Sequence, residues 1–203
     1  MLTLFAATSV ATRVAQAWPW YVVRAAGFIA VGLLILLIIS GIAQVTGLMY
    51  RFFEPVKAWA IHKALGYALA LAVMVHVGFL LIDTYLPFSL SQALIPFVSG
   101  YKPVSIAGVQ VSLWVAAGIV GLYGLAIILV TSWLLIDRQR KLWKGFHYLS
   151  YAVMALIFVH ALYLGSDLRY GTFRSAWLAI GGLIILAIGT RLWRAGLLKH
   201  RSS

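Results

Sequence analysis

The chain has 203 residues, of which 64% are hydrophobic and 10% carry a charge. In soluble domains about a quarter of the residues are charged, so this composition excludes an ordinary water-soluble globule and predicts an integral membrane protein. The formal net charge is +12, but the basic residues lie between apolar runs, which argues against a nucleic-acid partner and for membrane lipid. The sequence has no cysteine, which excludes disulfides, thiolate metal sites and a cysteine nucleophile.

Residues 1–23 precede the first long apolar interval. Their apolar stretch is interrupted by Arg13 and then by Pro19, so it is too short to cross a bilayer. The sequence therefore predicts an interfacial N-terminal segment over 1–23, with aromatic side chains at the level of the lipid headgroups. A cleaved signal peptide is the alternative, although no basic residue precedes the apolar run, as such peptides require.

Five intervals without Lys, Arg, Asp or Glu follow. A helix needs about 20 apolar residues to cross the hydrocarbon core, and its backbone polar groups must be bonded within it. The expected fold class is therefore all-α, a bundle of five transmembrane helices. Residues 24–195 form the membrane domain and 196–203 a tail, and the arginines beside the short last interval can snorkel. The intervals are 25–50, 64–82, 103–136, 145–166 and 175–190.

Lys and Arg are unevenly divided between the two sides that five helices define. Eleven lie in 51–63, in 138–144 or after residue 190, and five lie on the opposite side. Because cytoplasmic loops carry the excess of basic residues, we expect the C-terminus in the cytoplasm and a multi-pass protein of the cell membrane. On the opposite, outer side, the apolar segment 83–108 contains three prolines, and we expect it to form a cap or a docking surface.

Four histidines lie in two of the expected spans, where ionisable side chains are uncommon and point to function. His62 and His76 lie in the second span, and His147 and His160 in the fourth. Both spans start from the same side, so His62 shares a level with His147 and His76 with His160, and the levels are about 20 Å apart. Two level pairs without an intramembrane carboxylate predict the axial ligands of two b-type hemes. Buried hydrogen-bonded imidazoles and a proton relay are the alternatives.

The spacing in the fourth span does not fit a regular helix. At 100° per residue, His76 returns to within about 40° of the face of His62, whereas His160 misses the face of His147 by about 140°. We therefore expect a bulge, kink or tilt between His147 and His160, and we favour a π-bulge. Small residues nearby either make room for a macrocycle or serve helix packing. The candidates for the first role are Gly66, Ala72, Gly78 and Gly145, and Gly118, Gly121 and Gly124 are expected to serve packing.

One basic residue stands out near the outer histidine pair. Heme propionates need cationic or hydrogen-bonding partners, most often Arg or Lys. Arg24 starts a span on the side where positive charge is disfavoured, so we expect it to serve the outer heme rather than to act as an orientation signal.

These features resemble the ferric reductase-like transmembrane domain, a superfamily that includes ferric reductases, the membrane part of NADPH oxidases and the heme subunit of a bacterial methionine sulfoxide reductase system. The resemblance covers roughly residues 20–195. It implies two b-type hemes, one held by His62 with His147 and one by His76 with His160, and it implies that Arg24 is the cationic residue near the outer heme. The motif residues are Arg24, Gly27, His62, Leu65, Gly66, His76, Trp143, His147, Tyr151 and His160.

The expected function is that of a di-heme cytochrome b. It moves electrons from a cytoplasmic flavoprotein or a membrane quinol to an outer acceptor such as ferric iron, dioxygen or an extracytoplasmic redox protein. Related oxidoreductases append FAD and nicotinamide domains after the last span, whereas only about nine residues follow Arg194. We therefore expect the membrane component of an oxidoreductase with a separate donor protein and no catalytic side chain of its own. An accessory heme subunit of a larger redox complex and a heme-free transporter are the alternatives.

Overall fold

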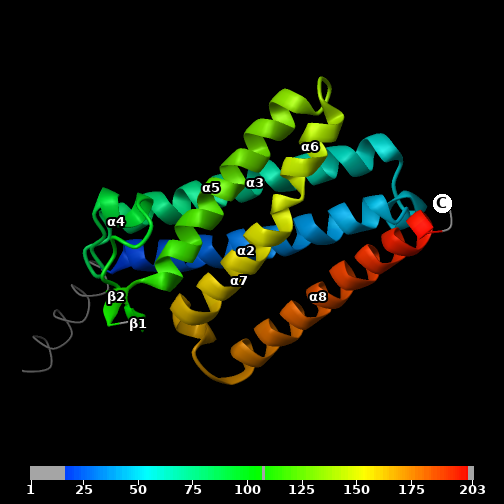
Figure 1. Ribbon diagram of the computed structural model, residues 1–203. Coiled ribbons are helices and arrows are strands. Elements are labelled where there is room, and N and C mark those ends of the chain that lie inside the picture. The colour runs from blue at the N-terminus through cyan, green and yellow to red at the C-terminus, as the bar shows by residue number, and fades with distance from the viewer. Residues whose placement is uncertain (1–16, 107, 201–203) are drawn as a thin grey trace, which may run out of the picture.

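The computed structural model describes residues 17–106 and 108–200, and most of them are helical. Five segments in this part of the chain are long and apolar enough to cross a membrane, which confirms the expected all-α membrane fold. Figure 1 shows them as one elongated bundle. They are α2 (Trp18–Val45), α3 (Pro55–Ile82), α5 (Leu113–Leu135), the pair α6 (Arg140–His147) and α7 (Leu149–Leu164), and the part Gly171–Thr190 of α8 (Gly171–His200).

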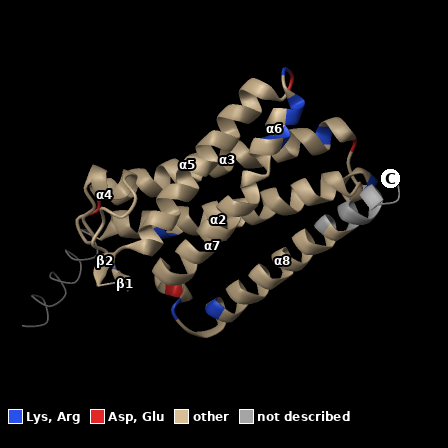
Figure 2. Cartoon of the chain, viewed as in Figure 1, with Lys and Arg blue, Asp and Glu red and all other residues tan. Residues whose placement is uncertain are grey.

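Charged side chains lie mostly toward the ends of these helices, and the middle of the bundle is almost free of them (Figure 2). This distribution is the one a bilayer imposes, because a charge at its centre is expensive. A short 3-10 helix, η1 (Leu48–Arg51), joins α2 to α3, and a second, η2 (Ser166–Leu168), joins α7 to α8. We call the end at which α2 begins and α3 ends the outer end, and the opposite one the inner end.

The first and last helices extend beyond the boundaries expected from the sequence. α2 begins at Trp18 with Pro19 in its first turn. Proline has no backbone N–H, but an N–H in the first turn has no acceptor within the helix, so no hydrogen bond is lost. Residues 18–23 of the expected interfacial segment are therefore helical and continuous with the first candidate span, and residues 1–16 lie outside the described residues. α8 continues to His200, so residues 196–200 of the expected tail are helical.

The fourth span is broken directly after His147, as the histidine spacing predicts. α6 ends at His147 and α7 starts at Leu149. The backbone N–H of Tyr151 donates to the carbonyl oxygen of Tyr148 at 3.2 Å, which is the tighter bond of a 3-10 turn. The kink is confirmed, but its form is a tight turn, so the expected π-bulge is wrong.

The connection between α3 and α5 is folded, and it includes strands that the sequence did not indicate. Asp83 is 3% exposed and accepts backbone N–H groups of the turn that follows α3. A short helix, α4 (Leu90–Leu94), begins at a capping box formed by Ser89. The strands β1 (Val104–Ile106) and β2 (Val109–Val111) then form an antiparallel hairpin at the outer end (Figure 1).

The hydrophobic core lies along the axis of the bundle. α2 packs along α3, and α5 packs along α7, so four helices surround the interior, while α8 packs on η2, α2 and α7. Apart from Met154, the core consists of small and branched apolar side chains, and small residues are what close helix packing in lipid favours. Its buried residues are Ala30, Leu34, Ile38, Leu69, Ala72, Leu125, Met154 and Ile184.

Candidate functional site

Two cavities lie one after the other along the bundle. The outer cavity has a volume of about 270 Å³ and the inner one about 370 Å³. Spaces of this size accommodate a large ligand rather than a single water molecule. Leu34, Leu125 and Val153 line both cavities, so a layer of three apolar side chains from α2, α5 and α7 lies between them.

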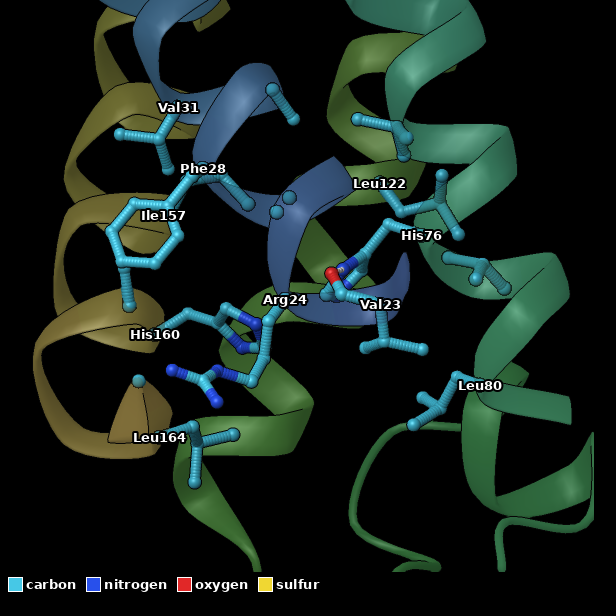
Figure 3. Close-up of a pocket in the computed structure, with 18 of the residues that line it drawn as sticks. Val23, Arg24, Phe28, Val31, His76, Leu80, Leu122, Ile157, His160 and Leu164 are labelled. Atoms are coloured by element: carbon cyan, nitrogen blue, oxygen red, sulfur yellow. Dashed lines mark hydrogen bonds between the residues drawn. The ribbon is translucent and has the colours of Figure 1, made fainter. Parts of the chain in front are cut away.

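The outer cavity brings together His76 from α3 and His160 from α7. Nδ1 of His76 donates to the carbonyl oxygen of Val23 at 2.8 Å, and Nδ1 of His160 donates to that of Trp114 at 2.9 Å. Because a carbonyl oxygen only accepts, both rings carry their proton on Nδ1 and keep the lone pair on Nε2. Metal-ligating histidines are commonly oriented by such a bond. Figure 3 shows both side chains together with Arg24 in this cavity.

The inner cavity brings together His62 from α3 and His147 from the end of α6. Their ring centroids are 6.1 Å apart. The hydroxyl of Ser40 donates to the carbonyl oxygen of Leu37 and accepts from Nδ1 of His62, each at 2.8 Å. His62 therefore also keeps its lone pair on Nε2. Sequence reasoning missed Ser40, because a serine in an apolar run carries no signal for the ring it contacts.

Two outer histidine rings lie against glycines of neighbouring helices. A Cβ on Gly118 of α5 would lie 2.5 Å from Cε1 of His160, and a Cβ on Gly27 of α2 would lie 3.2 Å from Nδ1 of His76. The first distance is far inside van der Waals contact, so the His160 ring occupies space that only glycine leaves. The assignment of Gly118 to helix packing was therefore wrong.

The other glycines divide between the two roles. A Cβ on Gly41 would lie 3.4 Å from Cε1 of His62, and Gly66 lines the inner cavity. Gly78 and Gly145 line neither cavity, so the structure does not support the expectation that they make room for a macrocycle. Packing is confirmed for Gly121 and Gly124, which face Ile157 and Val153.

Arg24 lines the outer cavity, where the sequence placed it, but it has a partner that the sequence did not reveal. Its Nε donates to Oδ2 of Asp167 at 3.1 Å, and its Nη2 donates to Oδ1. Asp167 also lines the cavity. The two residues are 143 positions apart, so no local pattern signals the pair. Among the described residues that line the outer cavity, they are the only ones with charged side chains.

The segment between α3 and α5 covers the outer cavity, which confirms the expected cap. Phe88 and Tyr101 line the cavity, and their rings meet edge to face with centroids 5.8 Å apart. The fully buried hydroxyl of Ser112 donates to the carbonyl oxygen of Tyr101 at 2.5 Å. Burial raises the pKa of the Tyr101 phenol above its ordinary value. The cap thus presents aromatic side chains to the cavity on a fixed backbone.

Lys102 attaches this cap to the fourth span. Its ammonium group donates to the carbonyl oxygen of Tyr163 at 3.3 Å and to that of Leu164 at 3.5 Å. These carbonyls belong to the last turn of α7 and have no partner within the helix. Burial lowers the pKa of Lys102, and the nearby positive charge of Arg169 lowers it further.

The inner cavity has an aromatic and cationic rim. Trp143 lies beside His147 with ring centroids 5.2 Å apart, and its indole N–H donates to Oγ of Ser132 at 3.1 Å. The ammonium group of Lys63 lies 4.1 Å from the ring centroid of Trp59, a cation–π contact. Lys63 and Trp143 both line the inner cavity, so they are candidates for contacting a ligand at this end.

The donor set fits a b-type heme better than a metal ion held by protein alone. No group of three or more histidine, cysteine or carboxylate side chains is close enough to chelate a metal within the described residues. In a heme, the macrocycle already holds the iron, so the protein needs to supply only axial ligands, and two imidazoles facing one apolar cavity can do so. Since the sequence has no cysteine, a heme here would be bound without covalent attachment.

Comparison with known protein families identifies a match for the membrane region. A family model described as ferric reductase like transmembrane component matches residues 54–158, more than half of the chain. The matched range contains His62, His76 and His147 and ends two residues before His160. No curated protein and no solved structure matches the chain.

Proposed function

The chain belongs to the family of ferric reductase-like transmembrane components and is a multi-pass membrane redox component, and from this membership we propose that it is a di-heme b-type cytochrome. His62 and His147 would hold the inner heme, and His76 and His160 the outer one. The observation that supports this proposal most directly is the pairing of two histidines in each cavity.

The hydrogen bonds at Nδ1 prepare the histidines for ligation. Val23, Trp114 and Ser40 each accept from the Nδ1 of one ring. These bonds fix the tautomer and restrict rotation of the ring, so that Nε2 is directed away from the acceptor. When bound, each heme supplies a one-electron centre whose potential depends on its axial ligands, hydrogen bonds and burial.

The apolar surroundings of the two cavities also suit electron transfer. Leu34, Leu125 and Val153 form the layer between the cavities and exclude charge from the middle of the bundle. A dry interior keeps the two sites in a low dielectric, in which single charged groups have large effects on a potential. The chain would thereby conduct electrons along the bundle axis without a path for ions.

The charge distribution supports one orientation of the chain in the membrane. The excess of Lys and Arg favours a cytoplasmic inner end and C-terminus in a plasma or inner membrane. We propose that a separate flavoprotein or a membrane quinol serves the inner site. The outer site, beneath the cap, would serve an external acceptor: ferric iron, dioxygen or an extracytoplasmic redox protein.

Heme content tests the proposal directly. The protein is expressed with ample heme, purified in detergent, and assayed by reduced-minus-oxidised spectra and by heme extraction. We expect low-spin b-type spectra and two hemes per chain. His76→Ala should remove the outer heme and spare the inner one, while His200→Ala, which changes the histidine that belongs to neither proposed pair, should leave both. A wild-type protein without a Soret band would refute the proposal and favour the transporter alternative.

The donor distinguishes an autonomous cytochrome from an accessory subunit. Reduction of the wild-type protein by NADH with a flavin reductase is compared with reduction by a quinol. Reduction by either supports the proposed role and identifies the donor class. Hemes that neither donor reduces, in a protein that co-purifies with a large membrane partner, would indicate an accessory subunit instead.

A further inference from the structure

The ion pair of the outer cavity is a charge-compensating unit in an apolar space. The side chains of Arg24 and Asp167 are 34% and 29% exposed, so both are partly withdrawn from solvent. The remaining described residues that line the cavity are uncharged. An uncompensated charge in such a place interacts strongly with other charges in the cavity, because the apolar surroundings screen it poorly. The balance between these two side chains therefore sets the net charge that the described protein lining contributes to the cavity.

A tight turn between α7 and η2 positions Asp167. Gly165 caps the C-terminus of α7, and a Cβ there would lie 2.5 Å from the carbonyl oxygen of Ala161 and 3.3 Å from Cδ1 of Leu168. Leu168 is 6% exposed and anchors η2 in the protein. The hydroxyl of Ser166 donates to Oδ2 of Asp167 at 3.2 Å. Asp167 is thus held by its own segment in the position from which it contacts α2.

The geometry of the pair leaves part of the arginine available. Nε and Nη2 of Arg24 donate to the two oxygens of Asp167, a bidentate arrangement that fixes the plane of the guanidinium. The guanidinium has five N–H donors, so Nη1 can still donate to another acceptor. Asp167 therefore neutralises and orients Arg24 without using all of its hydrogen-bonding capacity.

We propose that Asp167 is a positioning residue that compensates the charge of Arg24 and thereby lowers the reduction potential of the outer heme. This inference rests on the proposed function. The ferric form of a b-type heme carries one more positive charge than the ferrous form, so an uncompensated cation in the cavity favours the ferrous form. With Asp167 in place, that preference is cancelled, and the outer site remains a stronger reductant toward its acceptor.

The test is a potentiometric titration of the purified holoprotein, with the outer heme assigned from the spectrum of His76→Ala. The Asp167→Asn variant should raise the ratio of reduced to oxidised outer heme at a fixed potential by about tenfold. For a one-electron couple, this corresponds to a rise of about 59 mV in the reduction potential. Arg24→Gln should shift the potential in the opposite direction, and the double variant should lie near the wild type. Asp167→Glu should restore most of the wild-type value.

A carboxylate elsewhere at the outer end provides the matched control. Asp83→Asn changes a carboxylate that bonds to its own turn and does not line the outer cavity, so the outer potential should not move. The inner-heme potential should stay constant in all variants. If Asp167→Asn loses the outer heme, Arg24→Gln is compared with the double variant, whose potential should be the higher.

The possible failures are distinguishable. Two hemes per chain with the same outer potential in wild type and Asp167→Asn would overturn this inference and leave the proposed function intact. Shifts of the same sign in Arg24→Gln and Asp167→Asn would also overturn it, because they indicate structural loosening. A wild-type protein without heme would overturn the proposed function, and this inference with it.

Discussion

The ring of His160 fits against α5 because residue 118 is a glycine. A Cβ at Gly118 would lie 2.5 Å from Cε1 of the ring, and the bond from Nδ1 to the carbonyl oxygen of Trp114 leaves the ring little freedom to move. The orientation of one proposed axial ligand thus depends on a missing methyl group in the neighbouring helix.

The first prediction concerns this contact. Gly118→Ala should displace the His160 ring, because close-packed interiors do not absorb such an overlap without moving a side chain. We expect the heme content to fall from two to about one per chain, with the outer heme lost. Heme extraction and reduced-minus-oxidised spectra measure both quantities.

A glycine in open surroundings is the control for this substitution. Gly78→Ala adds the same methyl group where nothing lies within 4 Å, so it should retain both hemes. Gly41→Ala meets the His62 ring at 3.4 Å, an ordinary contact, and should weaken the inner heme only slightly. Retention of the outer heme in Gly118→Ala would refute the steric argument.

The second prediction concerns Ser40, which is 7% exposed and accepts from Nδ1 of His62. Ser40→Ala leaves that N–H without its acceptor, and loss of such a partner reduces metal affinity by about 10–100-fold in other proteins. We expect the inner heme to dissociate at least tenfold faster, measured by transfer to a heme-scavenging protein. Thr131→Ala removes a hydroxyl that bonds to its own helix and should leave the rate unchanged.

Much of the architecture was predictable because the signals are local in sequence. The spans follow from uncharged intervals, and the pairing of histidines by level follows from the rise of a helix along its axis. The kink after His147 was predictable from the angle between His147 and His160. Its form was not, since a tight turn and a π-bulge both correct the same angular mismatch.

The interactions that support the site were not predictable, because they depend on how each helix is rotated against its neighbour. Gly118 belongs to a series of glycines that all indicate packing, and only the packed structure shows that one of them faces His160. The pair of Arg24 and Asp167 joins positions 143 apart. Ser40 carries no signal in the sequence that distinguishes it from a serine bonded to its own helix.

The third prediction concerns pH and Tyr101. Burial holds the pKa of this phenol above its ordinary value, an effect that Arg169 partly opposes and Tyr85 reinforces. The unfolded chain therefore loses this proton at a lower pH than the folded chain. Tyr101 accordingly contributes stability that is fully present below about pH 10 and is lost as the pH rises through the folded-state pKa.

Thermal unfolding in detergent as a function of pH tests this expectation. The loss of unfolding temperature above about pH 10 should be smaller in Tyr101→Phe than in the wild type. Tyr21→Phe is the comparison, because Tyr21 is an exposed tyrosine of α2 outside the cap. Parallel curves for Tyr101→Phe and the wild type would contradict the prediction.

The fourth prediction concerns the turn at Gly165. An alanine here would bring its Cβ to 2.5 Å from the carbonyl oxygen of Ala161, and backbone cannot rotate away as a side chain can. We expect Gly165→Ala to shift η2 and to lower the free energy of unfolding by about 1–3 kcal/mol. Gly182→Ala, in a helix position with nothing within 4 Å, should be neutral or stabilising, since alanine favours helix over glycine.

The shift of η2 should also uncouple Asp167 from Arg24. The interaction free energy of the pair is measured by a double-mutant cycle, with Arg24→Gln and Asp167→Asn singly and together, in the wild-type and the Gly165→Ala backgrounds. If the turn positions the carboxylate, the coupling measured from thermal unfolding should be present in the wild type and reduced in Gly165→Ala. An undiminished coupling would show that the ion pair forms without this turn, and that Gly165 serves the packing of Leu168 alone.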